Sequence, residues 1–259
     1  MKMTTDTLGP GFPECYGIIP ARYGSSRFPG KPLAMILGKP MFLHVFERAS
    51  KCPEFSKVVV ATDDPRIHRA AEKQDVPVLL TRKDHPNGTS RVMEAARMLK
   101  IPEHAVVVNI QGDEPLLKAS MIRSLLLPFT DDSVEVTTLA REIDRGEAER
   151  PDQVKVVFST SGRALYFSRL PVPYWRDENG PRFFGHIGLY AFRMRTLRRF
   201  VSLKPTFLEK AENLEQLRLL ENDLAIHVAL TPHRCFGVDR PEDIERVEAL
   251  LASEKPVSQ

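Results

Sequence analysis

Short apolar runs alternate with amphipathic segments through the first half of this 259-residue chain. Strands are predicted at 16–19, 57–61, 77–80 and 105–110, and helices between them at 40–50, 65–73 and 90–99. This alternation is typical of a parallel sheet whose strands are joined by crossover helices. The pattern therefore predicts an α/β fold with a doubly wound, mostly parallel, Rossmann-like sheet.

The alternation ends near residue 134, where predicted strands follow one another without a helix between each pair. These strands are predicted at 134–139, 154–158, 164–167 and 186–192. They indicate a smaller mixed or antiparallel extension, which we assign to residues 134–200. Within it, residues 170–181 contain three prolines and the only Trp, so this segment is expected outside the sheet as an extended arm or flap. Later helices are predicted at 207–220 and 241–251.

Composition and charge narrow the class of protein. Hydrophobic residues make up 42% of the chain and charged residues 27%, which is a globular balance. We expect a flexible tail at 1–15 and one α/β domain at 16–253. The net charge of +3 is too small to indicate a nucleic-acid-binding surface, and no apolar run reaches the roughly 18 residues of a membrane span. The cysteines, Cys15, Cys52 and Cys235, are widely spaced, which favours a reducing cytoplasm over disulfides or a zinc site.

The stretch GSSRFPGKP at 24–32 follows the first predicted strand and has the composition of a phosphate-binding loop. It is not a Walker A loop, because five residues separate its glycines and Pro32, which has no hydroxyl for magnesium, follows Lys31. Open α/β sheets bind ligands outside the carboxyl ends of their strands, where this loop lies. Backbone amides with Arg22, Arg27 and Lys31 therefore predict a triphosphate site. The alternative is an ordinary surface turn of Gly, Ser and Pro.

Two aspartates stand at comparable positions for a metal ion. Asp113 follows the apolar run in VVVNIQGDEP, and Asp239 precedes a predicted helix in CFGVDRPEDIERV. Magnesium prefers one or two carboxylates, with water and phosphate oxygens as its other ligands. The pair Asp113 and Asp239 therefore predicts a Mg²⁺ site. A helix N-cap is the alternative role for Asp239, and Asp63 and Asp64 are rival carboxylates, although capping explains at least one of them.

Seven ordered stretches resemble the 3-deoxy-manno-octulosonate (KDO) cytidylyltransferases, or CMP-KDO synthetases: IIPARYGSSRFPGKPL, VVVATDD, NIQGDEPLL, ALYFSR, HIGLYAF, LEQLR and GVDRPEDIERV. The resemblance spans about residues 16–251 and implies a nucleotide-diphospho-sugar transferase-like fold. The implied reaction uses magnesium and converts CTP and the eight-carbon acid sugar into CMP-sugar and pyrophosphate, for lipopolysaccharide synthesis. It also implies a homodimer, for which residues 170–184 are either a contact arm or a lid over the site.

The same resemblance implies roles for individual residues. The implied catalytic residues are Arg22, Lys31, Asp113 and Asp239, of which the two aspartates bind the metal. The implied nucleotide contacts are Arg22, Ser25, Arg27, Lys31, Gly88, Thr89 and Arg91. The implied sugar contacts are Gln111, Arg169, His186, Glu215 and Gln216. For the last four, position alone allows another explanation. Arg169 could be a surface residue, His186 a polar strand end, and Glu215 and Gln216 helix-surface residues.

One loop departs from the family pattern. Family members have Ser-Gly-Thr-acid-Arg where this chain has Asn87-Gly88-Thr89-Ser90-Arg91. The family's loop lies near the base, so Asn87 and Ser90 bear on the distinction between cytosine and uracil. Ser90 also suits a helix cap, which would make the change structurally neutral.

Alternative functions stay open at this point. A cytidylyltransferase for another acidic sugar, such as 8-amino-KDO or sialate, would use the same metal pair. A non-catalytic nucleotide- or RNA-binding homologue would need no paired carboxylates, and its RNA binding would depend strongly on salt. For an enzyme, direct attack of the anomeric hydroxyl on the α-phosphorus is expected, because the FSR at 167–169 has no glycine elbow and no Cys adjoins a His.

Overall fold

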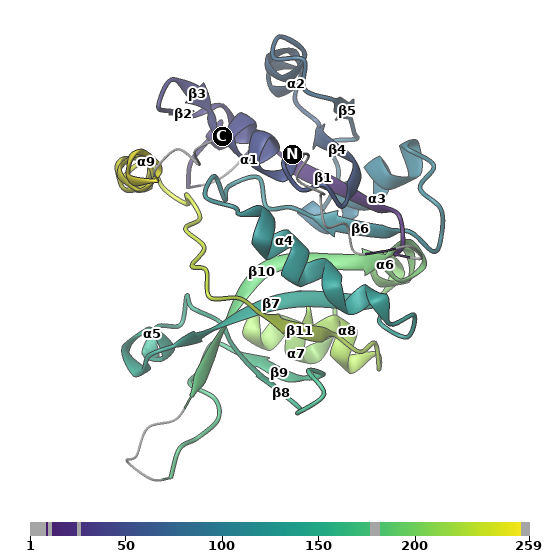
Figure 1. Cartoon of the computed structure of the whole chain (residues 1–259), viewed down its shortest axis with the longest axis vertical. Helices are drawn as coiled ribbons and strands as arrows, with labels where there is room; N and C mark the ends of the chain where they lie inside the picture. The colour runs from purple at the N-terminus through teal and green to yellow at the C-terminus, as the bar shows by residue number, and fades with distance from the viewer. Residues whose placement is uncertain (1–8, 10–11, 25–26, 177–181, 255–259) are drawn as a thin grey trace, which may run out of the picture. The chain divides into compact units, whose positions relative to one another are not determined.

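The computed structural model describes residue 9 and residues 12–24, 27–176 and 182–254 (Figure 1). The chain divides into two compact units. The first unit contains Met1–Glu14, Pro102–Val108 and Met121–Arg234, and the second unit contains Cys15–Ile101, Asn109–Ser120 and Cys235–Gln259. Most of the predicted tail at 1–15 lies outside the described residues.

A parallel sheet forms the centre of the second unit. Strand β1 (Cys15–Ala21) pairs in parallel with β4 (Phe55–Thr62), and β4 pairs in parallel with β5 (Val78–Leu80). The amide of Ile110 donates to the carbonyl of Ile18 at 2.9 Å, so the chain that leads to Asp113 continues beside β1. The parallel part of the predicted fold is confirmed. Its strands bring their carboxyl ends to one edge, which is where ligands bind in open α/β sheets.

Helices cover this sheet close to their predicted positions. Helices α1 (Met41–Ala49) and α3 (Gly88–Met98) contact β1 and β4, and α2 (Pro65–Glu72) contacts β4 and β5. Helix α2 begins at Pro65 because the side chain of Asp64 accepts a hydrogen bond from the Arg66 amide at 2.9 Å. The prediction that capping explains one of Asp63 and Asp64 is thus confirmed.

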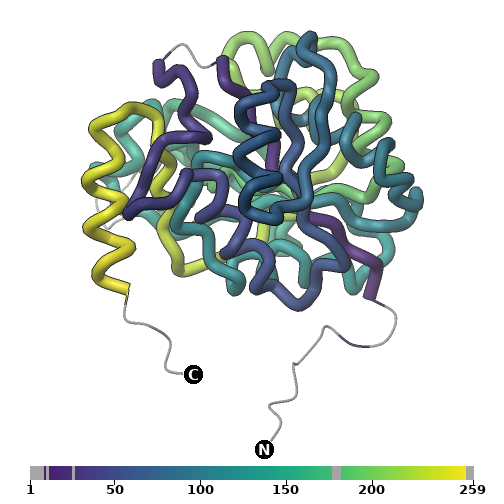
Figure 2. The backbone as a smooth tube through the Cα atoms, turned by 90° about the horizontal axis from the view of Figure 1, so that it is seen from above, coloured from purple at the N-terminus to yellow at the C-terminus, as the bar shows by residue number. Residues whose placement is uncertain are grey.

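The C-terminal helix α9 (Asp243–Ser253) lies beside the hairpin of β2 (Met35–Ile36) and β3 (Lys39–Pro40) (Figure 2). The carboxylate of Glu248 in α9 accepts a hydrogen bond from the Leu37 amide at 2.8 Å. One apolar cluster joins these segments, and its buried members are Ile36, Met41, Leu116, Val238 and Val247. Ala34, which follows the short 3₁₀ helix η1 (Lys31–Leu33), packs against it. This cluster fixes the backbone next to Asp239.

The first unit contains the mixed sheet predicted after residue 134. Its strand order is β11-β7-β10-β6, and β8 pairs with β10 and β9. Strands β7 and β10 are antiparallel, whereas β11 runs parallel to β7. The strands are β6 (Val106–Asn109), β7 (Val136–Ile143), β8 (Lys155–Phe158), β9 (Ala164–Ser168), β10 (Phe183–Arg193) and β11 (His227–Leu230). The helices near them are α4 (Ala119–Leu126), which begins in the second unit, η2 (Leu127–Thr130), α5 (Arg145–Glu149) and α6 (Met194–Ser202).

The single helix predicted at 207–220 is wrong. The segment forms two short helices, α7 (Phe207–Glu212) and α8 (Leu217–Glu221), separated at Asn213, whose φ of 52° is left-handed. The guanidinium of Arg169 donates to the carbonyls of Glu212 at 2.7 Å and Asn213 at 3.2 Å. These carbonyls are therefore satisfied outside a helix, which stabilises the break.

The described part of the predicted arm, residues 170–176, forms no strand, as expected from its prolines. Residues 177–181 of the same prediction lie outside the described residues. Within the part of the chain that the structure describes, no helix is long and apolar enough to cross a membrane.

Candidate active site

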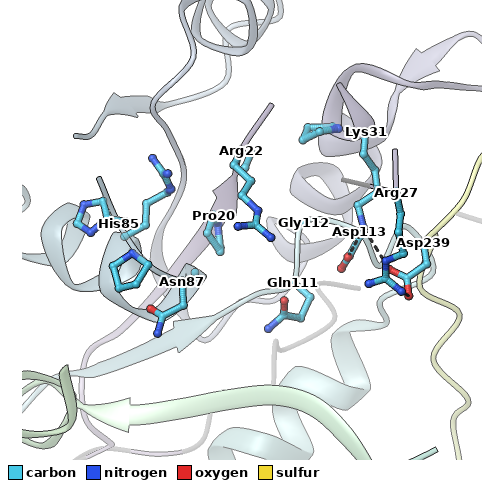
Figure 3. A pocket seen from close by; sticks show the side chains of 15 residues that line it. Pro20, Arg22, Arg27, Lys31, His85, Asn87, Gln111, Gly112, Asp113 and Asp239 are labelled. Carbon is cyan, nitrogen blue, oxygen red and sulfur yellow. Dashed lines mark hydrogen bonds and ion pairs between the residues drawn. The ribbon is translucent and has the colours of Figure 1, made fainter. Parts of the chain in front are cut away.

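A cavity of about 310 Å³ opens at the carboxyl edge of the parallel sheet in the second unit (Figure 3). It contains most of the residues that the sequence predicts for nucleotide and metal binding. Its lining includes Arg22, Arg27, Lys31, Gly88, Arg91, Gln111, Asp113 and Asp239. Thr89 is not among the lining residues, and Ser25 lies outside the described residues. The predicted loop and both predicted aspartates therefore belong to one site.

The first loop is closed on itself between Tyr23 and Gly30. The amide of Gly30 donates to the carbonyl of Tyr23 at 2.9 Å. Gly30 has a φ of 75°, and a Cβ at this position would lie 3.0 Å from the Tyr23 ring. A side chain here would be strained and would also displace the ring, so glycine is required.

A residue of α2 also contacts the Tyr23 ring. The guanidinium of Arg66 stacks on the ring, 3.3 Å from its centroid. Arg66 also donates to both carboxylate oxygens of Asp64, at 2.9 and 2.7 Å. This hydrogen-bonded arginine lowers the pKa of Asp64 to about 2. The loop that carries Arg22, Arg27 and Lys31 is thereby attached to the start of α2.

Loss of the Tyr23 ring should loosen this loop. We expect Tyr23→Leu to raise KM for the predicted triphosphate substrate about fivefold, the scale of one exposed cation–π contact, with little change in kcat. Tyr23→Phe keeps the ring and should behave like the native protein. Steady-state kinetics with varied triphosphate checks both variants, and equal KM values for the Leu and Phe variants would refute the role of the ring.

Asp113 and Asp239 come together through their backbones. The amide of Val238 donates to the carbonyl of Asp113 at 2.9 Å, and the Val238 side chain is fully buried. A Cβ on Gly112 would lie 2.8 Å from the carbonyl of Pro20, so only glycine lets the chain before Asp113 pass this close to β1. These contacts hold the two aspartates at the same edge of the sheet.

Both carboxylates converge on one cation, the ammonium group of Lys31. The Lys31 Nζ atom lies 2.6 Å from Oδ2 of Asp113 and 3.5 Å from Oδ1 of Asp239. Arg27 binds the other oxygen of Asp239 at 3.0 Å (Figure 3). Two carboxylates aimed at a single positive centre are a suitable donor set for Mg²⁺, with phosphate and water oxygens as further ligands. Among the residues described, no group of three or more His, Cys, Asp and Glu residues could hold a metal ion by itself, so a metal ion at this site would need ligands from the substrate and water.

The alternative role of Asp239 as a helix cap is wrong. Helix α9 begins at Asp243, four residues later than Asp239. The Asp243 carboxylate accepts from the amides of Asp239 and Arg240, both at 2.8 Å. These bonds hold the turn that leads into α9, whose N-cap residue is Glu242, and the Asp239 carboxylate is left to the two cations of the loop.

The loop at 87–91 shows how the departure from the family pattern is accommodated. The Asn87 side chain accepts a hydrogen bond from the Ser90 amide at 2.8 Å and caps α3, which begins at Gly88. The predicted cap at Ser90 is wrong, because the Ser90 hydroxyl donates to the Asn87 carbonyl at 2.9 Å inside the first turn. Asparagine and serine are both good N-caps, so Asn87 preserves the helix start.

Arg91 lines the cavity, but its guanidinium is largely engaged within the protein. It donates to the Thr81 hydroxyl at 2.5 Å and lies 3.2 Å from Oδ1 of Asp63. Its side chain is buried. Thr89 is also buried, and its hydroxyl accepts from the Asn109 side chain at 3.4 Å. These contacts join α3 to the ends of β4, β5 and β6.

Sequence reasoning did not single out His85. Its buried imidazole lines the cavity near Asn87 and contacts the Glu94 carboxylate of α3 (Figure 3). The signal for it was its place in the loop that precedes Asn87, in the stretch DHPNG.

Four predicted sugar contacts, Arg169, His186, Glu215 and Gln216, lie in the first unit. Arg169 donates to three backbone carbonyls, those of Pro151, Glu212 and Asn213. Its backbone carbonyl in turn accepts from the buried Lys155 ammonium at 2.5 Å. The Arg169 guanidinium is therefore already bound to the turn between α7 and α8 and to Pro151.

The other three predicted sugar contacts, His186, Glu215 and Gln216, belong to a polar group around β10. His186 is half-buried, and the exclusion of water from its ring lowers its pKa to about 3. Its ring lies 5.4 Å from the ring of Tyr190, which the sequence analysis did not select. The Gln216 amide nitrogen is buried with no hydrogen-bond partner, and Glu215 lies 3.8 Å from Arg218. Spacing of four residues along one strand places His186 and Tyr190 on the same face, a signal present in HIGLY.

Comparison with known proteins agrees with a nucleotide-binding site in this cavity. A family model for cytidylyltransferases matches residues 16–226. The chain belongs to the cytidylyltransferase family. A 3-deoxy-manno-octulosonate cytidylyltransferase of Oleidesulfovibrio alaskensis is 59% identical over 89% of this chain and 94% of the relative. Another, of Nitratidesulfovibrio vulgaris, is 57% identical over 92% of this chain and 96% of the relative.

A solved structure gives the same relationship in three dimensions. It is described as CMP:2-keto-3-deoxy-manno-octonic acid synthetase complexed with CTP, and it matches this cytidylyltransferase with a TM-score of 0.89 at 41% identity. The match covers 93% of this chain and 100% of that chain. The resemblance carried by the seven sequence stretches and the predicted fold class are both confirmed.

Proposed function

We propose that this cytidylyltransferase transfers CMP from CTP to the anomeric hydroxyl of KDO and releases pyrophosphate. The observation that carries the proposal is the convergence of Asp113 and Asp239 on one cationic centre beside the loop of Arg22, Arg27 and Lys31. The names of relatives at 57% and 59% identity support KDO as the sugar. The matching solved structure is a complex with CTP, which supports CTP as the nucleotide.

The chain's own residues would act mainly by position and charge. Arg22, Arg27 and Lys31 would hold the β- and γ-phosphates and offset the charge of the departing pyrophosphate. Asp113 and Asp239 would bind Mg²⁺, which supplies Lewis acidity at the α-phosphoryl oxygen. This arrangement would hold the phosphates and the attacking hydroxyl in one site, which favours direct transfer without a covalent intermediate.

Gln111 is the predicted sugar contact that lines the cavity itself. It immediately precedes Gly112 and Asp113, so it shares their rigid backbone. We propose that its amide hydrogen-bonds the sugar. For the residues of the first unit, the buried amide nitrogen of Gln216 supports a ligand contact better than the guanidinium of Arg169 does, because three of the guanidinium N–H groups already bind backbone carbonyls.

A substrate panel tests the proposal. Pyrophosphate release is measured with CTP, UTP or ATP, each with KDO, 8-amino-KDO, sialate or no sugar, in the presence of Mg²⁺. We expect release with CTP and KDO, and at most a few per cent of that rate with UTP. A preference for another acidic sugar would correct the substrate, and no release from any pair would favour a non-catalytic nucleotide- or RNA-binding protein.

We also propose a cytoplasmic homodimer. Cytoplasmic location is supported by the widely spaced cysteines and by CTP as the substrate. The dimer is supported by exposed apolar side chains in the arm, where Leu170 is 70% exposed, Tyr174 90% and Trp175 44%. Light scattering of the purified chain checks this part, and a monomeric mass at micromolar concentration would contradict it.

A further inference from the structure

The ammonium group of Lys31 fills the space between the two aspartates. It donates to Asp113 Oδ2 at 2.6 Å and to the Val238 carbonyl at 2.8 Å, and it lies 3.5 Å from Asp239 Oδ1. Two of the three ammonium hydrogens are therefore used in hydrogen bonds, and the contact with Asp239 is an ion pair. The predicted metal ligands therefore hold a positive charge of the chain itself.

The Lys31–Asp113 pair is largely shielded from solvent, whereas the Asp239 side chain is 51% exposed. The Lys31 side chain is 15% exposed and that of Asp113 is 32% exposed, whereas Arg27, which binds Asp239 from outside, is 62% exposed. Lys31 opens the short helix η1 directly after the constrained Gly30, and Val238 is fixed in the apolar cluster. The position of the ammonium is therefore set by the surrounding backbone.

We propose that Lys31 is a positioning residue that holds Asp113 and Asp239 together in the free enzyme and keeps the divalent cation out until a triphosphate takes over its ammonium group. The inference rests on the proposed function, since it assumes that the aspartates bind the catalytic cation. It adds an order of events, in which the nucleotide prepares the metal site.

The physical reason is competition for the same oxygens. A divalent cation that binds both carboxylates must displace the ammonium or lie a few ångströms from it, and like charges at that distance repel. A triphosphate offers several anionic oxygens to Lys31 and Arg27, and the same phosphate groups supply ligands that Mg²⁺ prefers. Nucleotide binding therefore frees the carboxylates as it completes the metal's coordination. By linkage, the metal must strengthen nucleotide binding to the same extent.

The first test measures metal binding without nucleotide. Free Mn²⁺ is titrated with the protein and followed by electron paramagnetic resonance. We expect Lys31→Met to bind Mn²⁺ about tenfold or more tightly than the native chain, within the usual range of coupling between sites. The double variant Lys31→Met/Asp113→Asn should lose this gain.

Arg22→Met is the matched control. It removes one positive charge from the same cavity, yet the ion pairs formed by the described residues join only Lys31 and Arg27 to the two aspartates. If general charge were responsible, Arg22→Met would gain as much Mn²⁺ affinity as Lys31→Met. That result would overturn the proposal, as would equal Mn²⁺ affinities of the native chain and Lys31→Met.

A second measurement uses the native chain, in case Lys31→Met does not fold. In protein labelled with ¹⁵N-lysine, the Lys31 ammonium should give a protected resonance that moves when CTP is added in EDTA and not when millimolar Mg²⁺ is added alone. A resonance that CTP leaves unchanged would overturn the proposal. These results are independent of the substrate panel, so failure to release pyrophosphate would count against the proposed function and not against the role of Lys31.

Discussion

Asp113→Asn is expected to lower kcat for CMP transfer about 100-fold or more, which corresponds to roughly 2.7 kcal/mol or more of transition-state stabilisation. The substitution keeps the size of the side chain but removes the charge that now binds Lys31 at 2.6 Å. The variant would hold Mg²⁺ through Asp239 alone, and the α-phosphoryl group would lose its alignment with the attacking hydroxyl. Pyrophosphate release with CTP and KDO at saturating Mg²⁺ measures the effect.

The matched control is Asp75→Asn in the same unit. Asp75 is exposed and has a left-handed φ of 53°, a conformation that asparagine also accepts. This control should keep native turnover. If Asp113→Asn also turned over at a near-native rate with Mg²⁺, the assignment of Asp113 to the metal would fail, and with it the proposed mechanism.

The site was predictable from the sequence because its parts follow strand ends. The apolar runs before Arg22 and Gln111 fix where β1 and β6 end, and parallel pairing then brings those ends to one edge. Asp239 does not follow a predicted strand, and its carboxylate alone suggested a metal ligand. Its place beside Asp113 depends on Val238, which is buried in an apolar cluster. Local pattern cannot show such a long-range contact.

Other features depend on partners that are distant in the sequence. The apolar spacing at 207–220 predicts one helix, yet the Arg169 guanidinium binds the carbonyls that this helix would have used. The ammonium of Lys31 was predicted to bind phosphate, and only the structure shows that it lies between the aspartates. In each case a charged side chain from elsewhere decides the local geometry, which no window of sequence contains.

His186 is expected to make the stability of the protein depend on pH. Its pKa is about 3 in the folded chain because of burial, against 6.5 for an ordinary histidine. The Thr138 hydroxyl donates to a backbone carbonyl of β10 and lies 3.0 Å from His186 Nε2, and the exclusion of water from the ring favours the neutral imidazole in the folded state. Between pH 6.5 and 3 the unfolded chain therefore binds one more proton than the folded chain.

The sign follows from this difference in protons. The contribution of His186 is complete above pH 6.5 and is lost as the pH falls toward 3, by up to about 5 kcal/mol at 1.36 kcal/mol per pH unit. From pH 7 to pH 4.5 we expect the unfolding free energy of the native chain to fall by about 2–3 kcal/mol more than that of His186→Gln. Urea unfolding followed by circular dichroism measures it, with the exposed His104→Gln as control. If the unfolding free energies of the native chain and His186→Gln changed equally between pH 7 and pH 4.5, the imidazole would not be held neutral. The polar group around β10 would then be open to protons from solvent.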